Sequence, residues 1–161
     1  MDECSLNPMQ ENKTWQEFET DIDKLVEMMG DYRPDVIVPS MNGGLVPAGI
    51  LAEKLSQKYG VPFRDVRPIS IEREGNTRRI AYDVQGDLSG QNILLLEDDL
   101  PSGKGFQHAK QEFEKRGASV KIAAVYVNSV SEPFADFYGE KLDPLPNLPW
   151  KPVRAGDRLI S

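Results

Sequence analysis

The chain has 161 residues, of which 39% are hydrophobic and 28% charged, an ordinary composition for a soluble globular domain. The net charge of −7 argues against general affinity for nucleic acids or anionic membrane surfaces, and the apolar runs are too short for a transmembrane helix. The single cysteine, Cys4, excludes an internal disulfide, and the acidic N-terminal stretch has no secretory signal, so we expect a reducing, cytoplasmic location.

The first elements are a helix and a strand. Thr14 and Glu17 form the pattern of a capping box, and apolar residues follow at helical spacing up to Met29. A short apolar run then predicts a buried strand at 35–38, which ends in a turn with two glycines at 39–44.

A second helix and a hairpin follow this turn. Small and apolar residues share one face over 45–59, and Gly60 is placed to end the helix there. The segments 68–72 and 78–83 flank a polar turn and predict two strands around an exposed loop.

The second half of the chain repeats the alternation of strands and helices. We expect the most apolar strand at 93–96, a helix at roughly 104–116, a buried strand at 121–127 and an irregular, proline-rich tail after residue 143. Strand–helix–strand alternation predicts an α/β fold, with a mainly parallel sheet that helices cover on both faces.

Three adjacent acids, Glu97, Asp98 and Asp99, follow the strand at 93–96, just before a helix start at 102–105. In open parallel sheets, ligands bind at the carboxyl ends of strands, where the next helices begin. Backbone N–H groups and the helix dipole make such a start an anion site, and glycines let a phosphate approach closely. Carboxylates nearby can accept hydrogen bonds from sugar hydroxyls or hold a metal ion. This junction therefore predicts a site for a ribose phosphate.

Two other interpretations of the junction are a P-loop and a solvated turn. A P-loop requires glycine where Asp98 stands and serine or threonine where Gly105 stands, so the sequence excludes it. In a solvated turn, Ser102 would cap the helix and the acids would face water, and this alternative stays open. For Asp99 we expect solvation or capping rather than ligand binding.

Residues 97–105, with the apolar strand before them, resemble the phosphoribosyl-pyrophosphate (PRPP) signature of type I phosphoribosyltransferases. That signature is an apolar strand, two acids, two mostly apolar residues and a short loop containing Thr-Gly. Residues 34–48 resemble the strand and pyrophosphate loop of 6-oxopurine members of that family. The segments 134–139 and 143–150 resemble the C-terminal hood of xanthine–guanine-type enzymes, so the resemblance runs from about residue 15 to 151.

The resemblance implies a single phosphoribosyltransferase-like domain over 14–161, with a small hood at 128–151, after a flexible N-terminus at 1–13. It implies binding of PRPP or a nucleoside 5′-monophosphate, together with Mg²⁺, and transfer of ribose 5-phosphate to a base with release of pyrophosphate. Dimers are common in this family, so a homodimer is compatible with the resemblance, whereas no nucleic-acid or membrane partner is expected.

The family's functional roles fall on particular positions of this chain. Glu97 and Asp98 would bind the ribose hydroxyls, and a mobile flap would shield the reaction from water. The other assignments are the 5′-phosphate loop (Ser102, Gly103, Lys104 and Gly105), the pyrophosphate loop (Met41, Asn42 and Gly43), the base or acceptor contacts (Asn128 and Leu145) and the flap arginines (Arg73, Arg78 and Arg79).

Five positions depart from the family pattern and put catalysis in question. They are Asn42 for the arginine of the pyrophosphate loop, Pro101 for the aspartate near purine N7, Gly105 for a phosphate-binding threonine, Asn128 for the lysine that reads purine O6, and Leu145 for the aromatic residue that stacks on the base. Three classes of function follow: an enzyme that transfers ribose 5-phosphate, a catalytically impaired regulatory module that binds PRPP or a nucleotide, and a plain interaction domain.

Overall fold

The computed structural model describes residues 10–151; the rest of the expected flexible N-terminus, 1–9, and the chain end, 152–161, lie outside the described residues. Its elements are α1 (Trp15–Met29), β1 (Val36–Pro39), α2 (Leu45–Tyr59), β2 (Ser70–Glu74), β3 (Thr77–Tyr82), β4 (Asn92–Leu100), α3 (Lys104–Lys115), β5 (Ser119–Val127), the 3₁₀ helix η1 (Glu132–Phe134) and β6 (Phe137–Lys141). Within 10–151, four strands form a parallel sheet in the order β1-β4-β5-β6, and β2 and β3 form a separate antiparallel hairpin. The predicted α/β class is confirmed.

Local sequence explains where the first two helices begin and end. Thr14 Oγ1 accepts a 3.1 Å hydrogen bond from the backbone N–H of Glu17, whose side chain accepts one from the N–H of Thr14, so the predicted capping box is confirmed. Gly60, with φ of 72°, ends α2 in the left-handed conformation and donates its N–H to the carbonyl of Ser56.

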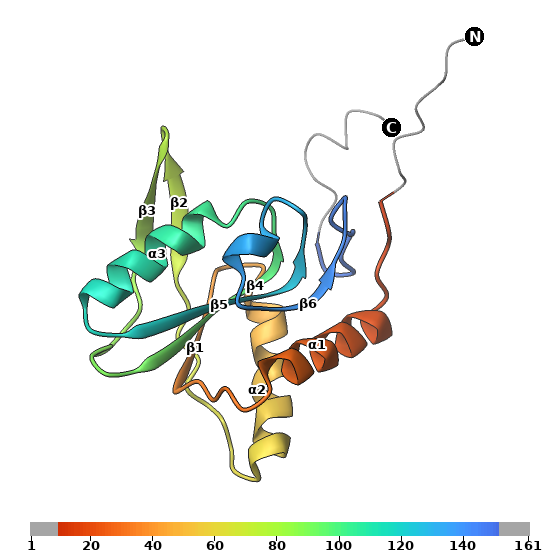
Figure 1. Cartoon of the computed structure of the whole chain (residues 1–161), viewed down its shortest axis with the longest axis horizontal. Coiled ribbons are helices and arrows are strands. Elements are labelled where there is room, and N and C mark those ends of the chain that lie inside the picture. Colours follow the sequence, from red (N-terminus) through yellow and green to blue (C-terminus); the bar gives the residue numbers. More distant parts are fainter. Residues whose placement is uncertain (1–9, 152–161) are drawn as a thin grey trace.

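Helices cover the two faces of the parallel sheet over separate apolar cores. As Figure 1 shows, α1 and α2 lie on one side of the sheet and α3 on the other. Phe18, Leu51 and Tyr126 belong to the first core, and Phe106 and Phe113 to the second. None of the helices described over 10–151 combines the length and apolar character that a membrane crossing requires.

Strand β4 is longer than the sequence predicted. It was expected at 93–96, but it pairs with β5 as far as Leu100, so Glu97, Asp98 and Asp99 lie within the strand. The prediction is too short because acidic residues are uncommon in strands. Strand β1 pairs with β4 only up to Leu96, which leaves the acidic half of β4 beside the turn that follows β1.

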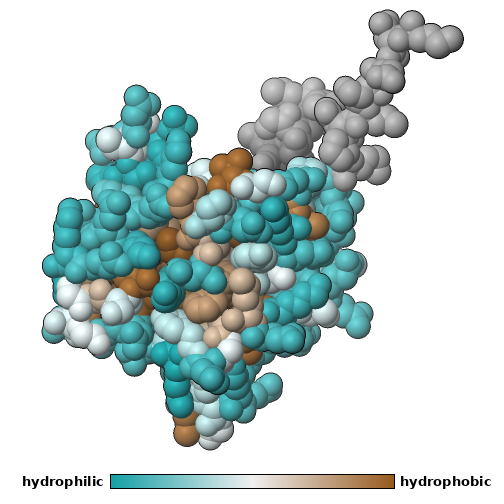
Figure 2. Space-filling model, in the orientation of Figure 1, coloured by the Kyte–Doolittle hydropathy of each residue, from teal (hydrophilic) through white to brown (hydrophobic). Residues whose placement is uncertain are grey.

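The β2–β3 hairpin projects from the body of the protein (Figure 1). Its strands are shifted by one or two residues from the predicted 68–72 and 78–83, and most of its side chains are exposed. Figure 2 shows this projection as mostly hydrophilic, whereas the apolar patches of that face gather near its middle. The hairpin therefore contributes little to the apolar cores.

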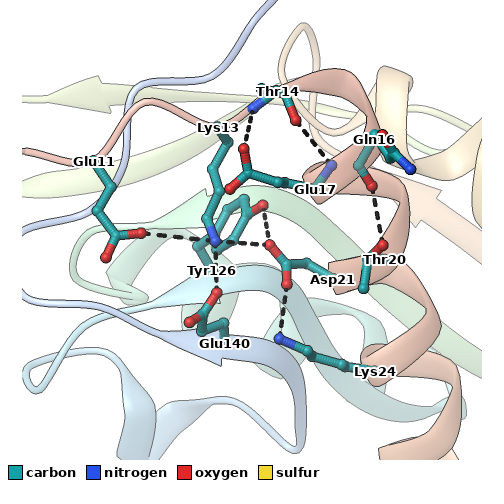
Figure 3. Close-up of polar contacts among 10 residues, drawn as sticks. All are labelled: Glu11, Lys13, Thr14, Gln16, Glu17, Thr20, Asp21, Lys24, Tyr126 and Glu140. Atoms are coloured by element: carbon teal, nitrogen blue, oxygen red, sulfur yellow. Dashed lines mark hydrogen bonds and ion pairs between the residues drawn. The ribbon is translucent and has the colours of Figure 1, made fainter.

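A buried polar network ties the N-terminal segment to the sheet (Figure 3). The ammonium of Lys13 lies 3.1 Å from Asp21 Oδ2 and 2.7 Å from Glu140 Oε2. The hydroxyl of Tyr126 donates a 2.6 Å hydrogen bond to the same oxygen of Asp21. Residues 10–13, which we expected to be part of a flexible terminus, are thereby joined to α1, β5 and β6.

Candidate functional site

Two strand-to-helix junctions lie next to each other at the carboxyl edge of the parallel sheet. Strand β1 leads into α2 and its neighbour β4 leads into α3, and the N-caps of these helices are Gly44 and Gly103. Neither glycine has a side chain to cap the helix, and Ser102 Oγ reaches the N–H of Lys104 only at 3.4 Å. Uncapped helix starts present backbone N–H groups and a positive dipole end, which favour an anion.

The turn after β1 packs directly on the acidic half of β4. A Cβ atom at Gly43 would lie 2.7 Å from Asp98 Oδ2, and one at Gly44 would lie 2.5 Å from the carbonyl oxygen of Leu96. Only glycine permits these approaches. The Met41–Asn42 peptide of the same turn is cis. The structure thus brings the predicted pyrophosphate loop into contact with a predicted ribose-binding acid.

The predicted 5′-phosphate loop is bounded by the hairpin and by η1. Gly103 has a φ of 78°, and a Cβ atom there would lie 3.2 Å from Phe134 of η1. A Cβ atom at Gly105 would lie 3.4 Å from Cγ2 of Ile71 in β2. The base of the predicted flap therefore adjoins the start of α3.

The flap arginines contact their own hairpin. The side chain of Arg79 donates to Glu72 at 2.9 Å. Arg73 donates to the carbonyl of Gly75 at 3.1 Å, and Arg78 contacts the carbonyl of Thr77 at 3.4 Å.

The three acids of β4 are in different environments. Asp98 is 1% exposed and Asp99 5%, while Glu97 is partly exposed. The interpretation of this segment as a solvated turn is therefore wrong for Asp98 and Asp99. Asp98 Oδ1 accepts a 2.6 Å hydrogen bond from the N–H of Asp99. Burial raises the pKa of Glu97 well above its usual value of 4.5, and the charge of Asp98 raises it further.

Lys151 is a cation of the site that the sequence analysis missed. Its ammonium lies 3.0 Å from Asp98 Oδ2 and 2.9 Å from Asp99 Oδ1. Burial opposes the charge on Lys151, but attraction to Asp98 and Asp99 outweighs burial and the pKa of Lys151 is raised. In sequence, 52 residues separate Lys151 from Asp99, and no motif links them.

The side chain of Asn128, one of two predicted base contacts, is hydrogen-bonded around its own loop. Its Nδ2 donates to the carbonyl of Pro101 at 3.1 Å, and its Oδ1 accepts from the N–H groups of Val130 at 3.0 Å and Ser131 at 2.9 Å. The other, Leu145, is 8% exposed and belongs to the core beneath α1 and α2. Neither side chain offers an aromatic face or a charge to a base.

The part of the chain that the structure describes contains no cluster of side chains that could bind a metal ion without ligands from another molecule. Over residues 10–151, no group of three or more His, Cys, Asp or Glu side chains is placed to hold a metal ion. Asp98 and Asp99 both bind the ammonium of Lys151.

Comparison with known proteins gives consistent matches. A family model described as "Phosphoribosyl transferase domain" matches residues 10–153. The adenine phosphoribosyltransferase of Maridesulfovibrio salexigens is 28% identical over 110 residues, and the match covers 64% of this chain and only 64% of that protein's length. The crystal structure of a purine phosphoribosyltransferase from Pyrococcus horikoshii matches with a TM-score of 0.77 at 25% identity, covering 91% of this chain and 97% of the other.

A second solved structure extends the likeness of fold. It is a mutant hypoxanthine phosphoribosyltransferase from Trypanosoma cruzi in complex with IMP, with a TM-score of 0.70 at 20% identity. The match covers 86% of this chain and 79% of that one. The family match at residues 10–153 includes both strand-to-helix junctions.

Proposed function

Because this chain belongs to the family of phosphoribosyl transferase domains and has the type I fold, we propose that it binds PRPP or a nucleoside 5′-monophosphate and transfers ribose 5-phosphate to a base. The contact between Gly43 and Asp98 carries the proposal. It joins a glycine turn suited to pyrophosphate with a carboxylate suited to ribose hydroxyls, beside two uncapped helix starts.

In the proposed reaction, the bond between C1′ of the ribose and the pyrophosphate oxygen breaks and a bond from C1′ to a ring nitrogen of the base forms. Pyrophosphate is the leaving group and takes up the proton that the nitrogen loses. Mg²⁺ that enters with PRPP would neutralise part of the negative charge on this leaving group. Glu97 and Asp98 would accept hydrogen bonds from the ribose hydroxyls and fix the position of C1′. Backbone N–H groups at 102–105 would hold the 5′-phosphate, and closure of the β2–β3 hairpin would exclude water.

A purine is the acceptor class that the relatives favour. The curated relative is named for adenine and the Pyrococcus horikoshii protein for purines. Discrimination among purines should be weak, because the amide of Asn128 is neutral and is already hydrogen-bonded to its own loop and to Pro101. A site discriminates strongly only where a polar group is built to pair with the substrate.

A catalytically impaired module that binds PRPP or a nucleotide is the second candidate. Pro101 offers no carboxylate at the position that faces purine N7 in the resembled enzymes, and Asn42 brings no charge to the leaving group. Both candidates keep Glu97 and Asp98 as the ribose-binding pair. Ligand binding therefore tests the site, and only turnover separates the two candidates.

Calorimetry with PRPP and Mg²⁺, and separately with AMP, GMP and IMP, tests the proposed site. A screen of adenine, guanine, hypoxanthine and xanthine for pyrophosphate release then tests transfer. Binding with release supports the enzyme, and binding without release for any base supports the regulatory module. Absence of binding to PRPP and to all three nucleotides would contradict both.

A further inference from the structure

Both carboxylate oxygens of Asp98 are occupied from within the chain. Its Oδ1 accepts the N–H of Asp99 at 2.6 Å, and its Oδ2 lies 3.0 Å from the ammonium of Lys151. Gly43 packs against the same carboxylate, and the whole residue is 1% exposed. While Lys151 stays in this position, a ligand hydroxyl has no approach to Oδ2.

We propose that Lys151 is an internal competitor for the ribose site, whose ammonium must leave Asp98 before a ribose hydroxyl can bind there. The inference rests on the proposed function, because it takes Asp98 as a ribose-binding group. In this arrangement the ligand-free site is closed by the chain itself. The apparent affinity for ligand is then the affinity of the open site multiplied by the fraction of molecules in which Lys151 does not cover Asp98.

Asp99 strengthens the closed arrangement. It stands where the PRPP signature has a mostly apolar residue, and it gives the ammonium of Lys151 a second carboxylate at 2.9 Å. Asp99 is itself 5% exposed, so the carboxylate side of this ion pair is shielded from water. The acid and the lysine together form a contact that ribose binding itself does not require.

The side chain of Lys151 can leave without displacement of the hood. It is 30% exposed, so its ammonium has a route to solvent, whereas Asp98 is held on both sides. The preceding residue, Trp150, is anchored by its ring contacts with Phe18 at 4.3 Å and Trp15 at 5.5 Å between centroids. The proposed opening is therefore a rotation of the long lysine side chain away from Asp98, with Trp150 left in place.

The direction in which PRPP affinity changes when the charge of Lys151 is removed distinguishes two roles for this lysine: competition for Asp98 and attraction of the ligand. If the ammonium of Lys151 helped to attract an anionic ligand, its removal would weaken binding of PRPP. Competition for Asp98 predicts tighter binding after the same change, even though a positive charge is lost. General electrostatics alone cannot produce this result.

The test compares Lys151→Met, Asp99→Asn and Lys54→Met with wild type by calorimetry with PRPP and Mg²⁺. Lys54 is the matched control: it loses the same charge, its ammonium also contacts two carboxylates, at 2.7 and 3.3 Å, and it lies on α2 away from Asp98. We expect Lys151→Met to bind about tenfold more tightly, as for a site that is open in about a tenth of molecules. Asp99→Asn should tighten binding less, and Lys54→Met should bind as wild type does.

Each outcome of the comparison is decisive. Unchanged or weaker binding by both Lys151→Met and Asp99→Asn overturns the inference, and Asp99→Asn decides alone where the lysine variant does not fold. If wild type binds PRPP and Asp98→Asn abolishes that binding, a lack of tightening removes this inference and leaves the proposed function standing. If no variant binds PRPP or a nucleotide, both fall.

Discussion

The side-chain amide of Asn128 donates a 3.1 Å hydrogen bond to the carbonyl oxygen of Pro101. These residues occupy two of the five positions that depart from the family pattern, and the structure joins them across β4 and β5. The amide oxygen of Asn128 also accepts two backbone N–H groups of the next turn. The two departures therefore form one structural unit, which ties the loop after β4 to the loop after β5.

Replacement of Asn128 tests this structural role. Asn128→Ala should lower the free energy of unfolding by about 1–3 kcal/mol, because two backbone N–H groups and one carbonyl lose their partner. Asn128→Asp should retain most of the stability, because it keeps the acceptor for both N–H groups. Denaturant unfolding gives the comparison, with Asn147→Ala as a control whose side-chain bond to Asn12 is exposed. Equal losses at 128 and 147 would contradict the assignment.

Restoration of two family residues tests whether the chain is a weakened purine enzyme. Pro101→Asp returns a carboxylate near the base, and such a group typically changes a rate by about 10²–10⁴-fold. Asn42→Arg returns a cation where charge develops on pyrophosphate. For the double variant we expect a large rise in pyrophosphate release with guanine or hypoxanthine. Binding of PRPP is measured first, because loss of proline could loosen the phosphate loop.

The result for the double variant separates the two candidate functions. Intact PRPP binding with no rise in transfer would contradict a weakened purine enzyme, and would favour another acceptor or the regulatory module. Wild-type protein should turn over hypoxanthine and guanine slowly, because Asn128 provides no charge for purine O6. Wild-type turnover at ordinary enzymatic rates of about 1–10³ s⁻¹ would contradict this account.

Features encoded over short distances in the sequence were predictable. The bounds of α2 follow from its apolar face and from Gly60, and the start of α1 follows from Thr14 and Glu17. Strand β6 was missed, since only a parallel pairing with β5 identifies the segment Phe137–Lys141 as a strand. Its residues are half-buried at the edge of the sheet and show no continuous apolar run.

Part of the site was also predictable, because a short sequence motif encodes it. The signature placed Glu97 and Asp98 at the end of a parallel strand, where the sheet brings them beside the glycine turn. The contact of Lys151 with Asp98 and Asp99 depends on how the hood folds back over the sheet, which no local pattern encodes. The burial of Asp99 was missed because a charged residue in a buried strand needs a partner that only the tertiary structure supplies.

Glu97 should make stability depend on pH in a defined direction. Because burial raises its pKa above 4.5, folded protein keeps a proton on Glu97 over a pH range in which the unfolded chain has lost it. Stability from this residue is therefore full below 4.5 and is lost as pH rises through the raised pKa. Glu97→Gln cannot ionise, so its free energy of unfolding should exceed that of wild type increasingly as pH rises.

Glu112→Gln is a control for which the pH dependence of stability should run in the opposite direction. The hydrogen bond with Lys115 lowers the pKa of Glu112, so its contribution is present at higher pH and is lost as pH falls. Unfolding of both variants over a pH series checks the two trends. A Glu97→Gln curve parallel to that of wild type would contradict a raised pKa for Glu97.

The buried network of Figure 3 should be essential for stability. The Lys13 side chain is 7% exposed and its partner Asp21 3%. Lys13→Met leaves Asp21 and Glu140 without their shared cation and should cost about 3–5 kcal/mol, as for a broken buried pair. Lys24 also contacts Asp21, at 3.1 Å, but it is 51% exposed, so Lys24→Met should cost less than about 1 kcal/mol.

The pKa of Asp21 gives a second check on the same network. Burial opposes ionisation of Asp21, but hydrogen bonds from Tyr126 and Lys13 outweigh it and lower the pKa. The stability that Asp21 contributes is present above its ordinary pKa of 3.8 and is lost as pH falls through the lowered value. Asp21→Asn should therefore destabilise the protein most at neutral pH, and an equal effect at all pH values would contradict an ionised Asp21.

The central claim is that Glu97 and Asp98 hold the ribose of a phosphorylated ligand. Calorimetry with PRPP and Mg²⁺ on the double variant Glu97→Gln, Asp98→Asn tests it most directly, because both side chains keep their size and lose the carboxyl group. The matched control is the double variant Glu112→Gln, Glu114→Gln, which removes the same charge from α3. We predict heat of binding for wild type and for the control, and none for the variant at the junction. Equal affinity of all three proteins for PRPP would contradict the account.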